Sequence, residues 1–164
     1  MIWQAYLVLA LVTLQRLGEL VLAERNTRRL LARGAHEVGR SHYPFLVAVH
    51  AGWLLALWLL APGPPIHILP LLIYVLLQVA RIWVIASLGE RWTTRIIVLP
   101  AAPLVRRGPY KWVDHPNYLI VIAEIAVLPL VFGLPVVAAF FSVLNAIVLW
   151  VRVREENQAL RSRS

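Results

Sequence analysis

Residues 66–88 read IHILPLLIYVLLQVARIWVIASL, a run whose one ionised side chain belongs to Arg81. A helix of this length, at about 1.5 Å per residue, crosses the hydrocarbon core of a bilayer, which is about 30 Å thick. Backbone groups in lipid must bond to one another, so such runs predict helices and not isolated strands. Apolar runs of this kind lie at about Ile2–Leu22, Tyr43–Ala61, Ile66–Leu88, Tyr118–Phe132 and Leu134–Val151. The sequence therefore predicts an all-α integral membrane protein of about five transmembrane helices.

The composition predicts one membrane domain. Sixty per cent of the 164 residues are apolar, and neither a repeat nor a long linker divides the chain, so residues 1–164 form a single domain. The break Gly133-Leu134-Pro135 predicts that the last two helices form a tight hairpin. The absence of cysteine excludes disulfides, thiol nucleophiles and cysteine-ligated metals, and we expect no metal site.

Basic residues gather in three polar segments. Residues 24–42 hold five of them, residues 89–117 hold five, and the C-terminal tail holds four, which makes fourteen of the sixteen in the chain. The connections around Pro62–Pro65 and Gly133–Pro135 hold none. The positive-inside rule therefore predicts an outside N-terminus and a cytoplasmic C-terminus. We expect the net charge of +8 to meet anionic lipid headgroups and not nucleic acid.

The long connection of residues 89–117 carries two local signals. The segment Trp92–Leu99 is rich in β-branched residues and predicts a short hairpin or an extended segment at the membrane interface. Pro109 and Pro116 forbid a continuous helix, so the chain must turn sharply between them. Pro116 suits the first turn of the following helix, because its missing N–H costs nothing there.

Residues 107–118, RGPYKWVDHPNY, place aromatic residues and a histidine at the cytoplasmic mouth of a membrane helix. A solvated loop has no need of this combination, so the stretch is a candidate binding site. The simpler alternative is an amphipathic connector whose Trp and Tyr side chains lie in the interfacial belt.

Four ionisable residues interrupt the apolar runs. Each costs at least ~2.5 kcal/mol in the membrane, so a paired or functional role is expected. Arg16 and Glu19 lie three apart on one helical face and can pair. For Arg81 two expectations remain open: snorkelling to the cytoplasmic face, or contact with Glu124 or a ligand.

The polar tail continues the last helix. Arg152 and Glu156 lie four residues apart on one face of it, next to the predicted cytoplasmic mouth. They are candidate site residues. The alternative is a solvated, self-paired helix end.

These residues together resemble a known family. The ordered set Gly108-Pro109-Tyr110, His115-Pro116-Asn117-Tyr118, a helical hairpin and Arg152…Glu155-Glu156…Leu160 is similar to the isoprenylcysteine carboxyl methyltransferases. The resemblance covers about residues 92–160. The segment WTTRIIVLP at 92–100, with Glu124 and Leu128-Pro129-Leu130, looks more like a bacterial branch. That branch is associated with type III polyketide synthases and O-methylates long-chain alkylpyrones or phenolic lipids.

The resemblance implies a methyltransferase that binds S-adenosylmethionine at the cytoplasmic ends of the C-terminal helices, within about residues 91–160. Arg152 would face the acidic oxygen of a lipid-like acceptor. A carboxylate or acidic enol acceptor is already ionised, whereas a phenol benefits from a base, for which Glu124 is the candidate. The implied cofactor-binding residues are Ala102, Pro103, Leu104, Val105, Tyr110, His115, Pro116, Asn117, Tyr118 and Glu156.

Two departures from the family pattern affect the acceptor and the cofactor. Asp114 stands where the family commonly has arginine, which reverses a charge beside the cofactor. The chain also stops soon after Leu160, without the longer tail of enzymes that act on prenylated proteins. We therefore expect a smaller lipid as the acceptor. Because the acceptor is apolar and the cofactor cytoplasmic, we expect the acceptor to enter sideways from the bilayer. The expected location is a bacterial inner membrane.

Two other functions fit parts of the pattern. Membrane sterol and lipid reductases carry a related Gly-x-Tyr…His-Pro-x-Tyr segment, and Arg106 and Arg107 would then meet the phosphate of a nicotinamide cofactor. A non-catalytic membrane subunit would use the buried charges only to pair helices. The sequence specifies neither the acceptor nor the oligomeric state.

Overall fold

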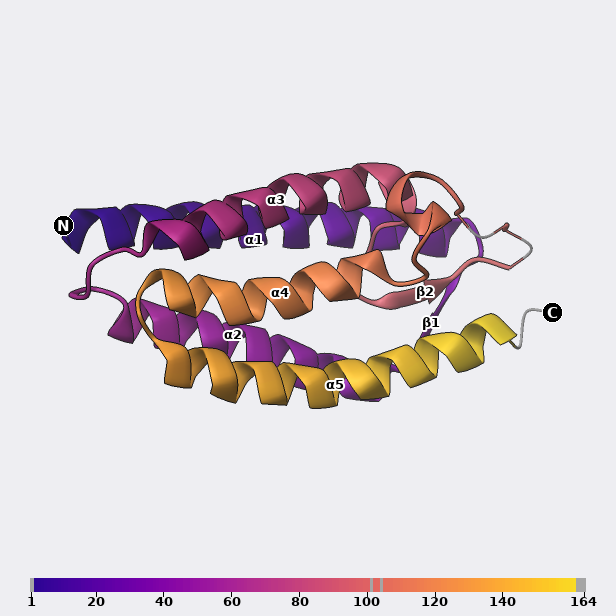
Figure 1. Cartoon of the computed structure of the whole chain (residues 1–164). Coiled ribbons are helices and arrows are strands. Elements are labelled where there is room, and N and C mark those ends of the chain that lie inside the picture. Colours follow the sequence, from indigo (N-terminus) through magenta and orange to yellow (C-terminus); the bar gives the residue numbers. More distant parts are fainter. Residues whose placement is uncertain (1, 101, 104, 162–164) are drawn as a thin grey trace.

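The computed structural model describes residues 2–100, 102–103 and 105–161, and most of them are helical (Figure 1). Within this part of the chain four helices are long and apolar enough to cross a membrane, and α4 is a shorter apolar helix. The helices are α1 (Ile2–Ala32), α2 (Tyr43–Leu60), α3 (Ile68–Leu88), α4 (Pro116–Val131) and α5 (Pro135–Arg161). The predicted all-α integral membrane fold is confirmed.

The five helices run alongside one another, with the N-terminus at one end of the bundle and the C-terminus at the other (Figure 1). The core contains Trp53, Leu57, Ile125, Leu128 and Phe132, each at most 1% exposed. Large apolar side chains cover the outside of the bundle as well. Val21, Leu59, Leu69 and Val136, from four different helices, are between 69% and 79% exposed. A continuous apolar exterior of this kind is suited to lipid and not to water.

The predicted hairpin between the last two helices is present. Gly133 adopts a positive φ of 68°, which a residue with a Cβ rarely tolerates. The amide of Leu134 bonds to the carbonyl of Pro129 at 3.0 Å, and Pro135 begins α5. At the other end of α4, Pro116 occupies the first turn as predicted.

The first connection is shorter than the sequence analysis predicted. Helix α1 continues through the charged segment to Ala32 and does not end near Leu22. Two contacts explain the extension: an ion pair between Arg28 and Glu24 at 2.9 Å, and the Asn26 amide, which donates to the carbonyl of Trp92 at 2.8 Å. The loop after α3 therefore stabilises the extension of α1.

The extended segment predicted near Trp92–Leu99 is present, but it does not form a hairpin with its own neighbours. Strand β2 (Ile96–Val98) pairs antiparallel with β1 (His36–Val38) from the first connection, with Glu37 opposite Ile97. Sequence-local reasoning missed this partner because the two strands lie far apart in the chain. An ion pair between Arg95 and Glu37 at 3.2 Å supports the pairing.

Three short 3-10 helices complete the described part of the fold. They are η1 (Arg40–His42), η2 (Gly89–Arg91) and η3 (Gly108–Lys111). The strands and the loop that holds η3 lie at the same end of the bundle as the C-terminus (Figure 1). This end gathers the polar connections, as the charge distribution predicts.

Candidate functional site

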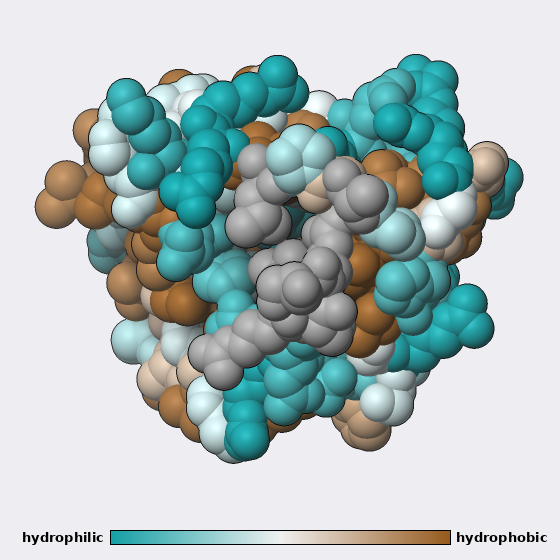
Figure 2. Space-filling model, turned by 90° about the vertical axis from the view of Figure 1, so that its right-hand side faces the viewer, coloured by the Kyte–Doolittle hydropathy of each residue, from teal (hydrophilic) through white to brown (hydrophobic). Residues whose placement is uncertain are grey.

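The predicted cofactor residues converge on a cavity of about 490 Å³, which we call the polar cavity. It lies at the end of the bundle that Figure 2 views, where hydrophilic side chains predominate. The predicted residues that line it are Pro103, Val105, Tyr110, His115, Asn117, Tyr118, Arg152 and Glu156. Neither Ala102 nor Pro116 is among the described residues of the lining, and Leu104 lies outside the described residues.

A glycine turn positions one wall of the polar cavity. Gly108 has a φ of 56°, and a Cβ at this position would lie 2.1 Å from the hydroxyl oxygen of Ser87. Arg107 donates from Nε to the carbonyl of Ser87 at 2.6 Å, which ties the turn to the end of α3. Tyr110 follows directly in η3. Burial and the Glu156 carboxylate raise the pKa of its hydroxyl above the usual value, so the group remains a hydrogen-bond donor.

Tyr118 joins the two predicted residues of α5. Its hydroxyl donates to the Glu156 carboxylate in a short contact and accepts from Nε of Arg152 at 2.8 Å. The His115 ring stacks on the Tyr118 ring, with centroids 5.3 Å apart. Tyr118 of α4 thus bridges Arg152 and Glu156. This arrangement differs from the alternative of a solvated helix end in which the two side chains pair directly with each other.

Arg152 is only 5% exposed, and its Nη1 has no hydrogen-bond partner among the described residues. A buried guanidinium nitrogen is costly to leave unpaired, so this atom indicates a position for a ligand oxygen. The planar fork of arginine suits a carboxylate or enolate.

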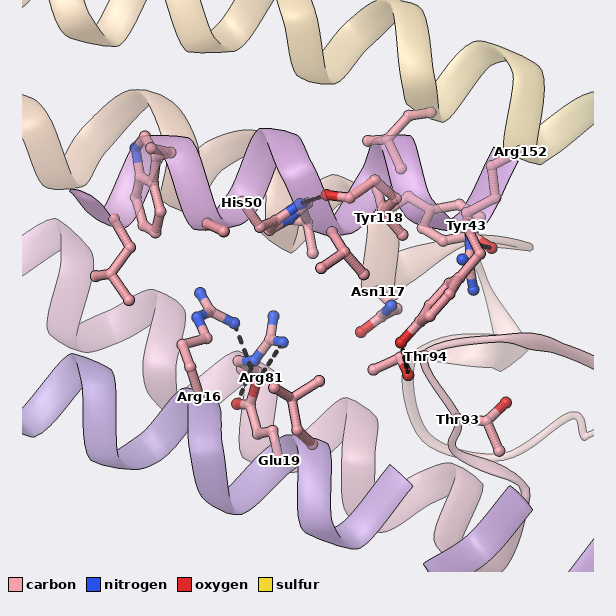
Figure 3. Close-up of a pocket in the computed structure, with 18 of the residues that line it drawn as sticks. Arg16, Glu19, Tyr43, His50, Arg81, Thr93, Thr94, Asn117, Tyr118 and Arg152 are labelled. Atoms are coloured by element: carbon pink, nitrogen blue, oxygen red, sulfur yellow. Dashed lines mark hydrogen bonds and ion pairs between the residues drawn. The ribbon is translucent and has the colours of Figure 1, made fainter. Parts of the chain in front are cut away.

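A second cavity, of about 270 Å³, adjoins the first, and we call it the apolar cavity (Figure 3). From α1 and α2 it is lined by Thr13, Arg16, Leu17, Glu19, Leu20, Tyr43, Leu46, Val47, His50, Ala51, Trp53 and Leu54. Five residues line both cavities: Trp92, Thr93, Asn117, Tyr118 and Arg152. The two spaces therefore meet at the Tyr118–Arg152 pair.

The apolar cavity reaches the lipid-facing surface between α1 and α2. Leu17, Leu20 and Val47 line it and are also 54%, 47% and 46% exposed. Side chains that belong both to a cavity wall and to the exterior mark the mouth of the cavity.

The charges within the membrane form one network between α1, α3 and α4. Arg16 pairs with Glu19 at 3.1 Å, as predicted, and with Glu124 at 2.8 Å. Arg81 contacts Glu124 at 2.8 Å and Glu19 at 2.5 Å. Of the two expectations for Arg81, contact with Glu124 is therefore the one observed, and it does not snorkel.

Glu124 lies apart from both cavities. It is fully buried, and no described part of either cavity wall includes it. Its oxygens accept hydrogen bonds from Arg16, Gln78 and Arg81 at 2.8 to 2.9 Å. Both oxygens are thus engaged by side chains of the bundle, and the geometry lends the predicted base role no support.

The sequence analysis missed several residues of the apolar cavity. Tyr43, His50, Thr93 and Thr94 line it, and the Tyr43 and Thr94 hydroxyls lie 3.1 Å apart. The signal for His50 was present, because it is a lone imidazole within the apolar run of α2. The threonines carried no signal, because they reach the bundle through contacts of their loop with elements far away in the chain, such as the bond from Asn26 to the carbonyl of Trp92.

Comparison with known proteins connects this arrangement to a family. The profile of the isoprenylcysteine carboxyl methyltransferase (ICMT) family matches residues 69–162, more than half of the chain. The uncharacterised protein YpbQ of Bacillus subtilis strain 168 is 38% identical over 164 residues, which cover 97% of this chain and 98% of the relative. An uncharacterised protein of Haemophilus influenzae strain KW20 is 27% identical over 153 residues, 88% of each chain. No solved structure matches this chain.

Proposed function

This chain belongs to the isoprenylcysteine carboxyl methyltransferase family and is a membrane methyltransferase, and we therefore propose that it transfers a methyl group from S-adenosylmethionine to an acidic oxygen of a lipid-like acceptor. The observation that carries this proposal is the junction of the polar and apolar cavities at Tyr118 and Arg152. A polar donor and a lipophilic acceptor need two such spaces, in contact at one point.

The residues of the polar cavity fit S-adenosylmethionine. The molecule carries an ammonium group, a carboxylate, a sulfonium and an adenine, and it supplies an electrophilic methyl group when bound. Glu156 offers a carboxylate for cationic groups, and the stacked rings of His115 and Tyr118 offer aromatic faces. The volume of about 490 Å³ lies in the range of small-molecule sites.

The residues at the junction position the acceptor. Arg152 would hold an anionic oxygen through the unpaired Nη1, while Tyr118 fixes the guanidinium from the other side. Trp92, 2% exposed, lines both cavities at the junction and adds apolar surface that would help to exclude water. Positioning and exclusion of water provide much of the acceleration of such a displacement. Because Glu124 lines neither cavity in its described part, we favour an acceptor whose oxygen is already ionised near neutral pH.

Two finer assignments complete the proposal. The mouth between α1 and α2 supports access of the acceptor from the bilayer. We also propose membership of the bacterial branch associated with type III polyketide synthases. Among its acceptors, alkylpyrones with an acidic enol are the first to assay, and phenolic lipids, which are not ionised near neutral pH, are the comparison. The segment 92–100 that carries this resemblance lies against both cavities.

Calorimetric titration with S-adenosylhomocysteine, the expected product, tests the donor site. We expect the detergent-purified protein to bind it with micromolar affinity, and the variant Arg152→Ala/Glu156→Ala to lose the binding. Glu155→Ala is the matched control, because Glu155 is the neighbour of Glu156 and is not among the described residues of the polar cavity. Binding of reduced nicotinamide cofactor in place of S-adenosylhomocysteine by folded protein would contradict the proposal and favour a reductase.

A further inference from the structure

The apolar cavity is not apolar throughout. Arg16 and Arg81 lie on one wall, and His50 of α2 lies on the opposite wall (Figure 3). The guanidinium ends of both arginines point across the cavity toward His50 (Figure 3). A pocket for an alkyl chain alone has no use for these groups, each of which is expensive to place in a membrane.

The arginines retain donors for a ligand. Each guanidinium has five N–H groups, and the contacts of Arg16 with Glu19 and Glu124 engage one N–H on each of its Nη atoms. The Arg16 side chain is 17% exposed, against 6% for Arg81, so Arg16 is the more accessible of the two. The two carboxylates balance the two guanidinium groups, so the network is neutral without a ligand. A ligand group that binds to this neutral network is therefore expected to be polar and uncharged, and not an anion.

His50 supplies the complementary acceptor. Its Nδ1 lies 2.8 Å from the carbonyl of Leu46 in the preceding turn of α2. A carbonyl can only accept, so Nδ1 carries the proton, and in the neutral ring Nε2 is a hydrogen-bond acceptor. Among the contacts of the described residues, Nε2 has no hydrogen-bond partner.

A hydroxyl both accepts and donates hydrogen bonds, so it matches a donor on one wall and an acceptor on the other. We propose that the acceptor lipid carries, besides the acidic oxygen held at Arg152, a hydroxyl in its apolar part that binds between His50 and Arg16. This inference rests on the proposed function and deepens it. Tyr43 lies beside Arg152 (Figure 3) and precedes His50 by seven residues of α2, which is about 10 Å along the helix. We therefore expect the hydroxyl about 10 Å deeper than the acidic oxygen.

A series of stearates that differ only in which carbon carries a hydroxyl tests this geometry. Their affinity is measured by displacement of a fluorescent fatty-acid analogue from purified protein saturated with S-adenosylhomocysteine. We expect mid-chain hydroxystearates to bind about tenfold more tightly than stearate. Isomers with the hydroxyl near either end should bind like stearate. The preference should fall to less than twofold in His50→Leu.

His67→Leu is the matched control, because His67 lies at the other end of the bundle and lines neither cavity in its described part. It should keep the full preference. Equal affinity for all stearates, or no displacement by any of them, with S-adenosylhomocysteine binding intact, would overturn the inference and leave the proposed function standing. A preference retained in His50→Leu would also overturn it. Failure of S-adenosylhomocysteine to bind would instead remove the proposed function itself.

Discussion

At the scale of single residues, Tyr118 connects the proposed donor site in the polar cavity with the proposed acceptor site at Arg152. Its hydroxyl bonds to Glu156 and Arg152, and its ring stacks on His115. A hydrogen bond to a charged group contributes roughly 1.5 to 3 kcal/mol. Tyr118→Phe keeps the ring and removes both bonds, so Glu156 loses its fixed position. We expect S-adenosylhomocysteine to bind about tenfold or more weakly by calorimetry.

Tyr74→Phe is the control for this variant. Its hydroxyl is buried, has no hydrogen-bond partner among the described residues and lines neither cavity in the described part. Its loss should therefore leave the affinity unchanged. Wild-type affinity in Tyr118→Phe would show that Glu156 needs no support from this tyrosine.

The residues of the polar cavity were largely predictable, and those of the apolar cavity were not. Tyr110, His115 and Glu156 belong to an ordered set of local motifs, which a single chain displays. His50 and Thr93 acquire their places only when α2 and β2 pack against distant elements. Composition and spacing carry little information on such long-range contacts.

At the scale of elements, the turn before η3 places the aromatic wall of the polar cavity. A Cβ on Gly108 would overlap Ser87, and the positive φ adds strain. We expect Gly108→Ala to displace Tyr110 and to weaken S-adenosylhomocysteine binding more than tenfold, while circular dichroism shows intact helices. Gly34→Ala is the control, since Gly34 also has a positive φ but nothing within 4 Å of its added Cβ. Equal losses in both variants would point to general strain in place of a specific clash.

The two corrections to the predicted elements have one physical cause. Residues 24–32 carry charge, and charge ends a membrane span without ending a helix. Helix α1 leaves the apolar region and continues because Asn26 bonds to the loop after α3. Strand β2 finds its partner in β1 for a similar reason, since the ion pair of Arg95 with Glu37 lies between segments that no local rule joins.

At the scale of the whole molecule, the charge network holds the bundle together beside the apolar cavity. Arg16 and Glu19 come from α1, Arg81 from α3 and Glu124 from α4. Each of the three helices contributes to the wall of this cavity, so their apolar packing is incomplete on that side. The network compensates for the missing contacts, and it leaves an open face for a ligand.

Glu124→Gln separates the structural from the catalytic role of this carboxylate. Loss of one partner of a buried ion pair costs about 3 to 5 kcal/mol, so we expect a clearly lower Tm in detergent. Glu24→Gln, which breaks an exposed pair, should change Tm little. Transfer of labelled methyl from S-adenosylmethionine into a lipid extract of the source membranes should stay within a few-fold of wild type below the lowered Tm. Loss of a general base would instead slow transfer about 10²- to 10⁴-fold. A slowing of that size in folded Glu124→Gln would return Glu124 to the chemistry, and the acceptor oxygen would then be a hydroxyl that must lose its proton.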